Sequence, residues 1–269
     1  MIYPTTNNPG TAIVTGASSG IGKLYAERLA SRGYNLVLVA RREDRLRRLA
    51  VDLEERFGVR AEVLVADLSK TEGVSAVSER IATDAAISLL VNNAGFSALR
   101  PLTQTPDETI ANMIALNVTA LTLLSKTALA AFKTREAGTL VNIGSGAGFA
   151  PYPGISVYGA TKAYVYLFTQ SIQSEVEGTP VRVQLVLPGA VVSEGWEVAG
   201  GAELEPLPAE IVMSTEDLVD AALVGLDRGE RVTAPSLHDE ALLRGYELAG
   251  ASALQGAFAA LPAARYTRG

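Results

Sequence analysis

Short apolar runs alternate with longer amphipathic segments along most of the chain. Six runs are almost continuously apolar, at residues 11–15, 35–40, 61–66, 88–92, 139–143 and 181–187. Strands that are buried on both faces have this pattern, because neither face meets water. We therefore predict six buried strands, and a shorter seventh strand at residues 231–234.

Helical periodicity fills the intervals between these runs. Apolar residues recur at three- and four-residue spacing, as on one face of a helix, over residues 21–32, 43–57, 70–84, 106–135, 157–177, 214–228 and 238–258. Thr105, followed by Pro106 and two acidic residues, and Ser214, with Asp217 after it, stand where helix N-terminal caps are expected. C-terminal caps are expected at three glycines, Gly33, Gly58 and Gly138.

Alternating strands and helices imply a parallel sheet with right-handed crossovers and helices on both faces. We predict one α/β domain over residues 1–269, a Rossmann-type doubly wound sheet of about seven strands, since no repeat or low-complexity linker divides the chain. Hydrophobic residues make up 48 % of the sequence and charged residues 19 %, which excludes an extended disordered chain.

Charge and composition exclude several classes of function. The net charge is −6 without a basic tract, so no nucleic-acid partner is expected. The absence of cysteine excludes disulfides, thiolate metal sites and a cysteine nucleophile. The single histidine, His238, excludes a multi-histidine metal site, and we expect it at the surface and no bound metal.

The sequence also bears on the compartment. Residues 1–10 lack the basic and apolar regions of a signal peptide. The most membrane-like stretch, residues 113–132, is interrupted by Asn117, Ser125 and Lys126. We therefore expect a cytoplasmic protein without a membrane span.

A glycine-rich loop follows the first predicted strand. Gly16, Gly20 and Gly22 let the backbone turn tightly and approach a ligand closely. The helix that follows offers free N–H groups and a positive dipole end to a pyrophosphate, so we predict that Ser18, Ser19 and Ile21 also contact a dinucleotide.

Two other interpretations of this loop stay open. It could be a βα turn that binds no ligand. Residues 16–20 also match the G-x-S-x-G elbow of hydrolases, with His238 as the base, although that chemistry would leave Gly22 without a role.

Ser145, Tyr158 and Lys162 form a second candidate constellation. Ser145 follows the fifth predicted strand, at the end where open α/β sheets place ligands. Tyr158 and Lys162 are four residues apart and so lie on one helix face. A nearby ammonium lowers a phenol pKa from its usual value of roughly 10, which would suit Tyr158 to proton transfer. The alternative is a half-buried tyrosine beside a solvated lysine.

These motifs together resemble the short-chain dehydrogenase/reductase family over about residues 10–235. The resemblance rests on Thr15-Gly16-x-x-x-Gly20-x-Gly22, Asn92-Asn93-Ala94-Gly95, Asn117, Ser145, Tyr158-x-x-x-Lys162 and Pro188-Gly189. It implies an oxidoreductase that transfers hydride between a nicotinamide and a carbonyl or alcohol, with Tyr158 as the acid or base.

The resemblance implies further roles. Lys162 would lower the Tyr158 pKa and hold the nicotinamide ribose, Ser145 would orient the substrate oxygen, and Asn117 would hold a water of the proton relay. The implied cofactor contacts are Asp67 with the adenine, Asn93, Ala94 and Gly95 beside the fourth strand, and Pro188, Gly189 and Ser193 near the nicotinamide. Ser193 replaces the threonine that is common there.

The second strand bears on which nicotinamide is bound. An acidic residue at its end would bind the ribose 2′-hydroxyl of NAD, but Ala40 stands there and Arg41 follows. A guanidinium can grip a 2′-phosphate, so we predict NADP(H) over NAD(H). The alternative is that Arg41 and Arg42 only open the charged helix that follows.

Residues 191–213 are expected to form a substrate lid. They include Trp196 and no lysine or arginine, so nothing in them favours a phosphorylated or CoA-linked substrate. A small to medium apolar substrate is suggested by apolar side chains in the lid and near the catalytic residues, namely Phe96, Phe149, Tyr152, Ile155, Val198, Leu204 and Leu207. The alternative is that most of these side chains are core or lid packing.

Helices 106–135 and 157–177 are apolar on more than one face, which predicts a homodimer or homotetramer. The family commonly pairs these two helices across subunits. A second function stays open at this point: a non-catalytic sensor or scaffold that binds NADP(H) in the same fold.

Overall fold

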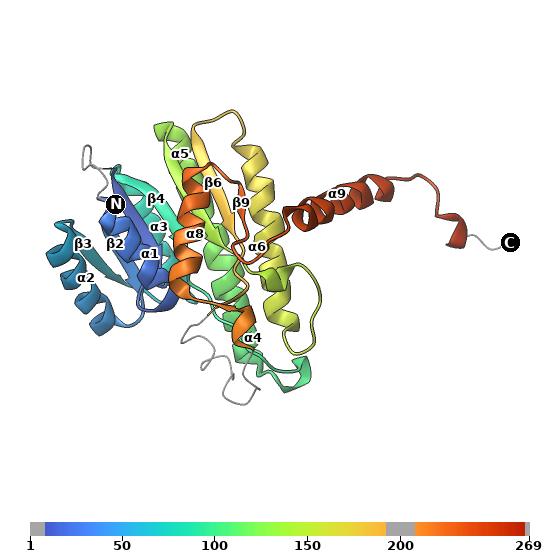
Figure 1. Cartoon of the computed structure of the whole chain (residues 1–269), viewed down its shortest axis with the longest axis horizontal. Coiled ribbons are helices and arrows are strands. Elements are labelled where there is room, and N and C mark those ends of the chain that lie inside the picture. Colours follow the sequence, from blue (N-terminus) through green and yellow to red (C-terminus); the bar gives the residue numbers. More distant parts are fainter. Residues whose placement is uncertain (1–8, 192–207, 267–269) are drawn as a thin grey trace. The chain divides into compact units, whose positions relative to one another are not determined.

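The computed structural model describes residues 9–191 and 208–266. The chain forms two compact units, Met1–Pro235 and Ser236–Gly269, and the first contains the sheet. That sheet is seven-stranded, in the order β3-β2-β1-β4-β5-β6-β9, and all neighbouring strands are parallel (Figure 1). The predicted doubly wound fold is confirmed, whereas one domain over residues 1–269 stays a prediction.

The strands lie close to the predicted bounds. They are β1 Thr11–Thr15, β2 Asn35–Ala40, β3 Ala61–Val65, β4 Ile87–Asn92, β5 Gly138–Ile143, β6 Val181–Val186 and β9 Val232–Thr233. Neighbouring strands β1 and β4 are the point where the order of the sheet reverses. Open sheets of this kind bind ligands beyond the carboxyl ends of the strands at such a reversal.

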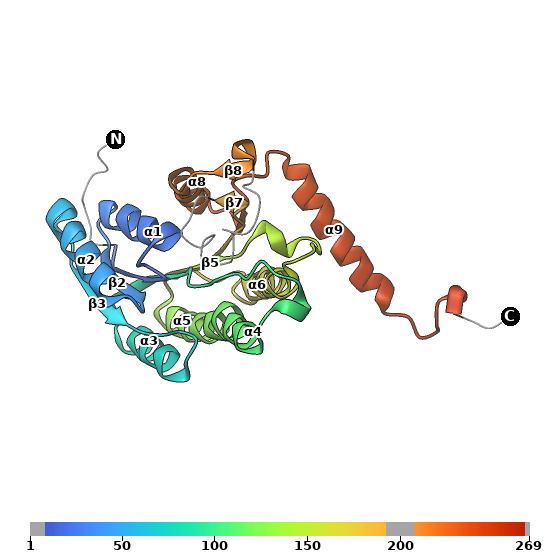
Figure 2. The same cartoon turned by 90° about the horizontal axis from the view of Figure 1, so that it is seen from below.

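Alternate strand residues supply two separate cores, one on each face of the sheet. Ala12 and Val14 of β1 belong to the first core, and Ile13 to the second. The first core is covered by α1 Gly20–Ser31, α2 Glu43–Phe57 and α8 Thr215–Asp227. The opposite face carries α3 Thr71–Thr83, α4 Asp107–Ile114, α5 Leu121–Arg135 and α6 Ser156–Glu175 (Figure 2). The prediction of helices on both faces is confirmed.

Strand β3 departs from the predicted pattern of strands buried on both faces. Its Glu62 and Val65 are exposed, because β3 is the edge strand and the flanking helices cover it only in part. Arg80 of α3 reaches across and pairs with Glu62 at 2.7 Å.

The predicted helix at residues 106–135 is not continuous. A π-helical segment, Ala115–Ala120, separates α4 from α5 and buries Asn117. By length and composition alone the stretch Asp107–Arg135 could cross a membrane, since an 18-residue window within it has a mean hydropathy of 1.5. Its apolar residues Leu124, Ala128 and Phe132 are buried in the second core, as in a core helix, and 44 % of that window is buried.

Two of the predicted helix caps are wrong. Thr105 does not cap α4, because its hydroxyl donates to the carbonyl of Pro101 at 3.1 Å and Pro106 precedes the helix. Gly138 is not the cap of α5, since Glu136 takes the left-handed conformation (φ 52°). Gly138 instead begins β5, where a Cβ would collide with the Phe132 ring.

The other caps are confirmed. Gly33 and Gly58 adopt positive φ just after α1 and α2. The Ser214 hydroxyl accepts a hydrogen bond from the Asp217 N–H at 2.9 Å at the start of α8. In the C-terminal unit, Asp239 caps the helix α9, Glu240–Ala257, which confirms the helix predicted at residues 238–258. His238 is exposed, as predicted.

Candidate active site

The loop between β1 and α1 has a shape that only glycine allows. Gly16 and Gly20 have positive φ values of 69° and 51°. A Cβ on Gly22 would collide with the Gly16 carbonyl and press on the Asn93 amide. Ser19 precedes α1 without a side-chain cap, so the N-terminal N–H groups of α1 face the loop. The loop and the first turn of α1 therefore offer backbone donors, with no side chain at the three glycine positions.

Thr15 holds this loop against the end of β4. Its hydroxyl donates to the Val91 carbonyl at 3.2 Å and accepts from the Asn93 and Ala94 N–H groups at 2.9 and 3.0 Å. The Asn93 side-chain amide donates to the Thr15 carbonyl at 2.9 Å. The predicted cofactor residues of the two strands thus lie together, at the reversal of strand order.

Arg42 reaches the glycine loop. Its guanidinium donates to the Ser18 hydroxyl at 3.0 and 3.1 Å and to the Ser19 hydroxyl at 2.6 Å. The sequence predicts that Arg41 binds a 2′-phosphate and predicts no cofactor contact for Arg42. The signal available was the arginine doublet itself, but the sequence does not show which side chain turns toward the loop.

Asp67 lies just beyond β3, close enough to Arg41 for the two charges to interact. Its carboxylate accepts from the Ser69 N–H at 3.0 Å and the Ser69 hydroxyl at 2.8 Å. Burial raises the pKa of Asp67, but these bonds and the charges of Arg41 and Lys70 outweigh burial and lower the pKa overall. Asp67 is therefore an ionised acceptor, and its adenine contact stays a prediction.

Ser145 and Tyr158 meet at the carboxyl end of β5. The Ser145 hydroxyl accepts from the Ala147 N–H at 3.1 Å, and the Ser145 and Tyr158 side chains are hydrogen-bonded. The Gly146 N–H donates to the Pro188 carbonyl at 2.7 Å, so Pro188 lies beside this turn. Burial raises the pKa of Tyr158, and the bond to Ser145 offsets only part of that effect. The phenol is therefore protonated near neutral pH.

Lys162 lies one helical turn after Tyr158, inside the protein. Its side-chain ammonium donates to the Ile143 carbonyl at 3.0 Å and lies 5.8 Å from the centre of the Tyr158 ring. Burial lowers the pKa of Lys162 to about 8. The alternative of a solvated lysine is excluded, because the residue is only 7 % exposed.

Asn117 is fixed by bonds to two other segments. Its amide exchanges hydrogen bonds with the backbone of Phe96, at 2.9 and 3.1 Å. It also donates to the Thr161 hydroxyl at 3.1 Å, and that hydroxyl donates to the Tyr158 carbonyl at 2.7 Å. Thr161 is not among the residues predicted from the sequence, although it is a polar residue inside the Tyr158-x-x-x-Lys162 motif.

Gly95 lies close to the side chains of both Asn117 and Lys162. A Cβ there would lie 2.9 Å from the Asn117 side-chain oxygen and 3.8 Å from the Lys162 ammonium. The four predicted catalytic residues, Asn117, Ser145, Tyr158 and Lys162, therefore lie together around the carboxyl ends of β4 and β5. Their catalytic roles stay predictions.

The predicted substrate side is described only in part. Strands β7 Ala190–Val191 and β8 Val212–Met213 pair in parallel and bring together the two ends of the predicted lid. Residues 192–207, which include Ser193 and Trp196, lie outside the described residues. Phe149 packs edge-on against Tyr166, with ring centres 5.7 Å apart, and Tyr152 is exposed.

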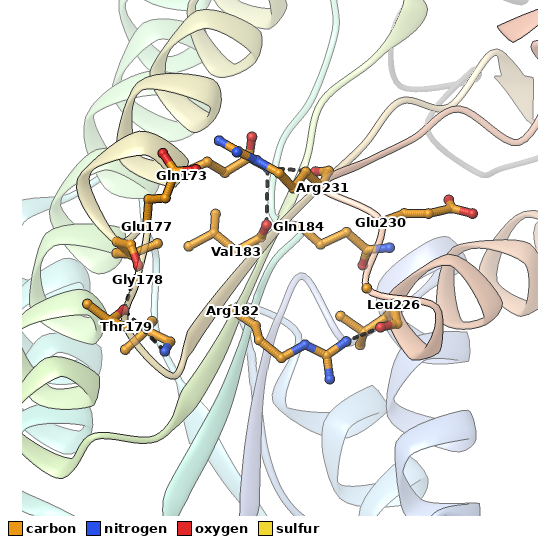
Figure 3. A pocket seen from close by; sticks show the side chains of 13 residues that line it. Gln173, Glu177, Gly178, Thr179, Arg182, Val183, Gln184, Leu226, Glu230 and Arg231 are labelled. Atoms are coloured by element: carbon orange, nitrogen blue, oxygen red, sulfur yellow. Dashed lines mark hydrogen bonds between the residues drawn. The ribbon is translucent and has the colours of Figure 1, made fainter.

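A separate cavity of about 210 Å³ lies beside the first residues of β6, Val181 to Gln184, and not at the carboxyl ends of the strands where the predicted site lies (Figure 3). In it the Gln173 amide donates to the carbonyls of Val183 and Arg231, at 3.1 and 2.6 Å. These bonds tie α6 to β6 and to the start of β9, which is a structural role, and none of the predicted site residues lines the cavity. Within the described part of the chain, no three acidic or histidine side chains gather where they could hold a metal ion.

Comparisons with known proteins agree with this geometry. The family model for short chain dehydrogenases matches residues 10–200. The very-long-chain 3-oxoacyl-CoA reductase of Anas platyrhynchos is 33 % identical over 205 residues, which are 75 % of this chain and 66 % of the relative. The chain thus spans just under two thirds of the length of that relative.

Two solved structures are similar over nearly the whole chain. A short-chain dehydrogenase from Sphingobium yanoikuyae in complex with NADPH is 44 % identical, with a TM-score of 0.91, over 96 % of this chain and 100 % of that one. A bulky-bulky ketone specific alcohol dehydrogenase from Comamonas testosteroni is 39 % identical, with a TM-score of 0.89, over 97 % of this chain and 100 % of that one.

Proposed function

This chain belongs to the short chain dehydrogenase family, and from that membership we propose that it reduces apolar ketones, or oxidises the matching alcohols, with NADP(H). The cofactor of the fold is a nicotinamide dinucleotide. The observation that carries the proposal is the Tyr158 phenol, hydrogen-bonded to Ser145 and one helical turn from the buried Lys162 ammonium.

The residues present fit a dinucleotide. A pyrophosphate needs backbone donors without Cβ atoms in the way, which Gly16 before α1 and Gly20 and Gly22 in its first turn provide. A 2′-phosphate needs positive charge beside that loop. Arg42 reaches Ser18 and Ser19 there, and Arg41 follows the end of β2, where an acidic residue would favour NAD instead. This charge supports NADP(H) over NAD(H).

Tyr158, Ser145 and Lys162 each have a separate role in the proton transfer. A bound nicotinamide supplies or accepts the hydride. In reduction, Tyr158 transfers its phenolic proton to the carbonyl oxygen, which becomes the alcohol hydroxyl, while Ser145 holds that oxygen by a hydrogen bond. The positive charge of Lys162 stabilises the phenolate that remains. Asn117 and Thr161 fix the segment of α6 that carries Tyr158.

The raised pKa of Tyr158 favours the reductive direction. A proton donor must be protonated at the working pH, and burial keeps the phenol in that form. Oxidation of an alcohol needs the phenolate instead, which the positive charge of Lys162 stabilises.

We assign the substrate to the class of apolar ketones and secondary alcohols, with groups bulkier than the small to medium size predicted from the sequence. The related enzyme from Comamonas testosteroni is specific for bulky-bulky ketones and aligns over 97 % of this chain. The curated relatives that reduce 3-oxoacyl-CoA offer the competing substrate class. Residues 191–213 contain no lysine or arginine to pair with CoA phosphates, which supports the ketone class.

The test is a substrate panel with the purified protein. Oxidation of NADPH, followed by absorbance, is measured with ketones that carry two bulky groups, with small aliphatic ketones and with a long-chain 3-oxoacyl-CoA. The proposal predicts at least tenfold higher kcat/KM for the bulky ketones than for the acyl-CoA. A preference for the acyl-CoA would overturn the substrate class, and no turnover with any of them would favour the non-catalytic alternative.

The chain is further proposed to be a cytoplasmic homo-oligomer. An exposed apolar face on α5 and α6, formed by Leu123, Tyr164 and Leu167, supports association of the sheet-bearing units. Thr122 and Tyr164 are hydrogen-bonded at 2.9 Å and join the two helices into one surface. Light scattering at micromolar concentration that shows only a species of 28.2 kDa would contradict this.

A further inference from the structure

Four buried polar side chains join the strands β4 and β5 to the helices α5 and α6, which lie on one face of the sheet (Figure 2). We call them the polar network: Asn92 at the end of β4, Ser125 of α5, Asn142 of β5 and Thr169 of α6. Each of the four is at most 3 % exposed. None of them takes part in the proton transfer proposed for Tyr158.

Each member of the polar network is hydrogen-bonded to at least one other member. The Asn142 side-chain N–H donates to the Thr169 hydroxyl at 3.1 Å, and the Asn92 side-chain N–H donates to the Asn142 side-chain oxygen at 3.0 Å. The Ser125 hydroxyl accepts from the Asn92 amide at 3.0 Å and donates to the Asn142 oxygen at 3.4 Å. The network therefore connects two neighbouring strands to each other and to two helices.

The direction of these bonds is determined by α6. The Thr169 hydroxyl donates its only proton to the Val165 carbonyl at 2.7 Å, so toward Asn142 it can only accept. Asn142 must therefore turn its N–H₂ group toward Thr169 and its oxygen toward Asn92 and Ser125. One hydroxyl on α6 thus fixes the orientation of an amide on β5.

Stability alone does not account for polar side chains at these positions. The Asn92 side-chain oxygen is buried and has no hydrogen-bond partner among the residues that the structure describes, which destabilises the folded state. Apolar side chains of the same shape are often as stable as a buried hydrogen-bonded pair. Hydrogen bonds between defined donors and acceptors do, however, favour one arrangement of the packed elements over others.

Helix α6 has two polar attachments to consecutive residues of β5. Near the start of the helix, Lys162 donates to the Ile143 carbonyl at 3.0 Å. Seven residues later, which is about two helical turns along the same face, Thr169 accepts from the Asn142 side chain. Two attachments on one face fix the rotation of the helix about its own axis. That rotation determines where Tyr158 and Lys162 point.

The polar network also reaches the segments that hold Asn117 and the glycine loop. The Asn92 amide donates to the carbonyl of Leu121 at 3.5 Å, directly after the π-helical segment that contains Asn117. Asn92 is followed by Asn93, whose side chain donates to the Thr15 carbonyl beside the glycine loop. The network therefore lies next to each strand and helix that carries a predicted catalytic residue.

We propose that Asn142 and Thr169 are positioning residues, whose hydrogen bond fixes the rotation of α6 against β5 and thereby holds Lys162 beside Tyr158. The proposal rests on the proposed function, in which the charge of Lys162 stabilises the Tyr158 phenolate. Both positioning residues are 0 % exposed, so they act through Lys162 and not by contact with substrate or cofactor.

The first test is Thr169→Val, which removes the hydroxyl and keeps the shape of the side chain. The Asn142 N–H then loses its acceptor on α6, and the second attachment is broken. A displacement of about 1 Å can slow an enzyme by about 10²-fold. We expect kcat for the NADPH-dependent reduction of a bulky ketone to fall by at least about tenfold, while the KM for NADPH changes by less than about threefold.

Two further variants separate positioning from general destabilisation. Thr169→Ser keeps the hydroxyl and should retain most of the wild-type kcat. Gln173→Leu is the matched control, because Gln173 is another buried polar residue of α6 but binds the carbonyls of Val183 and Arg231, away from the site. It should lower the free energy of unfolding and leave kcat within about twofold of the wild type.

The kinetic results are decisive in both directions. Slow Thr169→Val beside active Thr169→Ser and Gln173→Leu supports the proposal. A fully active Thr169→Val, or a Gln173→Leu protein that is equally slow, overturns it. If Thr169→Val does not fold, the double variant Asn142→Leu with Thr169→Val takes its place, because it removes both polar partners and leaves neither unpaired. The same fall in kcat is expected.

A double-mutant cycle tests the positioning without any need for activity. Urea denaturation is measured for the wild type, Thr169→Val, Lys162→Met and the variant that carries both substitutions. If Thr169 holds Lys162 in place, the change in the free energy of unfolding of the double variant differs from the sum of the two single changes. Additive changes would overturn the proposal. A wild type that reduces no ketone would contradict the proposed function and leave this cycle as the test.

Discussion

Lys162 is a cation that the fold buries, and this has a measurable consequence for stability. Its pKa falls to about 8 in the folded protein, from 10.5 when it is exposed. Between those values the unfolded chain binds a proton that the folded protein does not bind. The folded state is therefore penalised below pH 8, and the penalty is relieved as the pH rises toward 10.5.

Replacement of Lys162 by methionine should remove this pH dependence. The free energy of unfolding of the wild type, minus that of Lys162→Met, should rise by about 2 kcal/mol between pH 7 and pH 9.5. Urea denaturation at both pH values measures the difference, and the other titrating groups are common to both proteins. A difference that stays constant with pH would show that Lys162 titrates normally.

Arg42 is the second residue whose effect can be isolated. Its guanidinium lies on Ser18 and Ser19, so Arg42→Ala should reduce the preference for NADPH over NADH by at least tenfold, which is the effect of losing one charge-assisted hydrogen bond. Arg41→Asp should shift the same ratio, by repelling the 2′-phosphate. The measurement is kcat/KM with each cofactor.

A control for the loss of charge is available on α2. Arg47 pairs with Glu43 on the exposed side of that helix, so Arg47→Ala removes a positive charge close in sequence but not at the glycine loop. It should leave the cofactor ratio unchanged. If Arg42→Ala also left it unchanged, Arg42 would have no part in phosphate binding.

Among the elements, α5 ends in an unfavourable conformation. Glu136 adopts a left-handed backbone that costs a residue with a Cβ roughly 1 kcal/mol relative to glycine, and its side chain is exposed. Glu136→Gly should raise the free energy of unfolding by about 1 kcal/mol. Glu136→Ala keeps the backbone penalty and is the control. A destabilised Glu136→Gly protein, measured by urea denaturation, would contradict this account.

Elements whose signals are local are predicted well from the sequence. The bounds of β1, β2 and α2 match the prediction, because apolar runs and a C-terminal glycine define them within a few residues. The π-helical segment is not predicted. It is associated with bonds of Asn117 to Phe96, 21 residues earlier, and to Thr161, 44 residues later, which no local pattern reveals.

In the candidate site, too, local patterns can be predicted from the sequence, whereas contacts between distant segments cannot. The glycine loop and the Tyr158–Lys162 pair can be recognised from spacing and from the family resemblance. The contacts of Arg42 and Thr161 depend on side-chain directions across segments that meet only in the folded chain. Gly138 shows the same limit, since its need for glycine comes from the Phe132 ring and not from a helix end.

At the scale of the whole molecule, the order of the strands in the sheet brings the predicted site residues together. The reversal between β1 and β4 brings the glycine loop beside Asn93 and Ala94, and β5 next to β4 adds Ser145. Segments 130 residues apart thus converge at one end of the sheet.

The most direct test of the account compares the wild type with Tyr158→Phe, measuring NADPH binding and NADPH-dependent reduction of a bulky ketone in the same samples. Loss of the phenolic proton should lower turnover by at least about 10²-fold, while the Kd for NADPH changes by less than about threefold. Turnover that survives the substitution would contradict the acid role of Tyr158. A wild type that binds NADPH but turns over no ketone would contradict the proposed reaction itself.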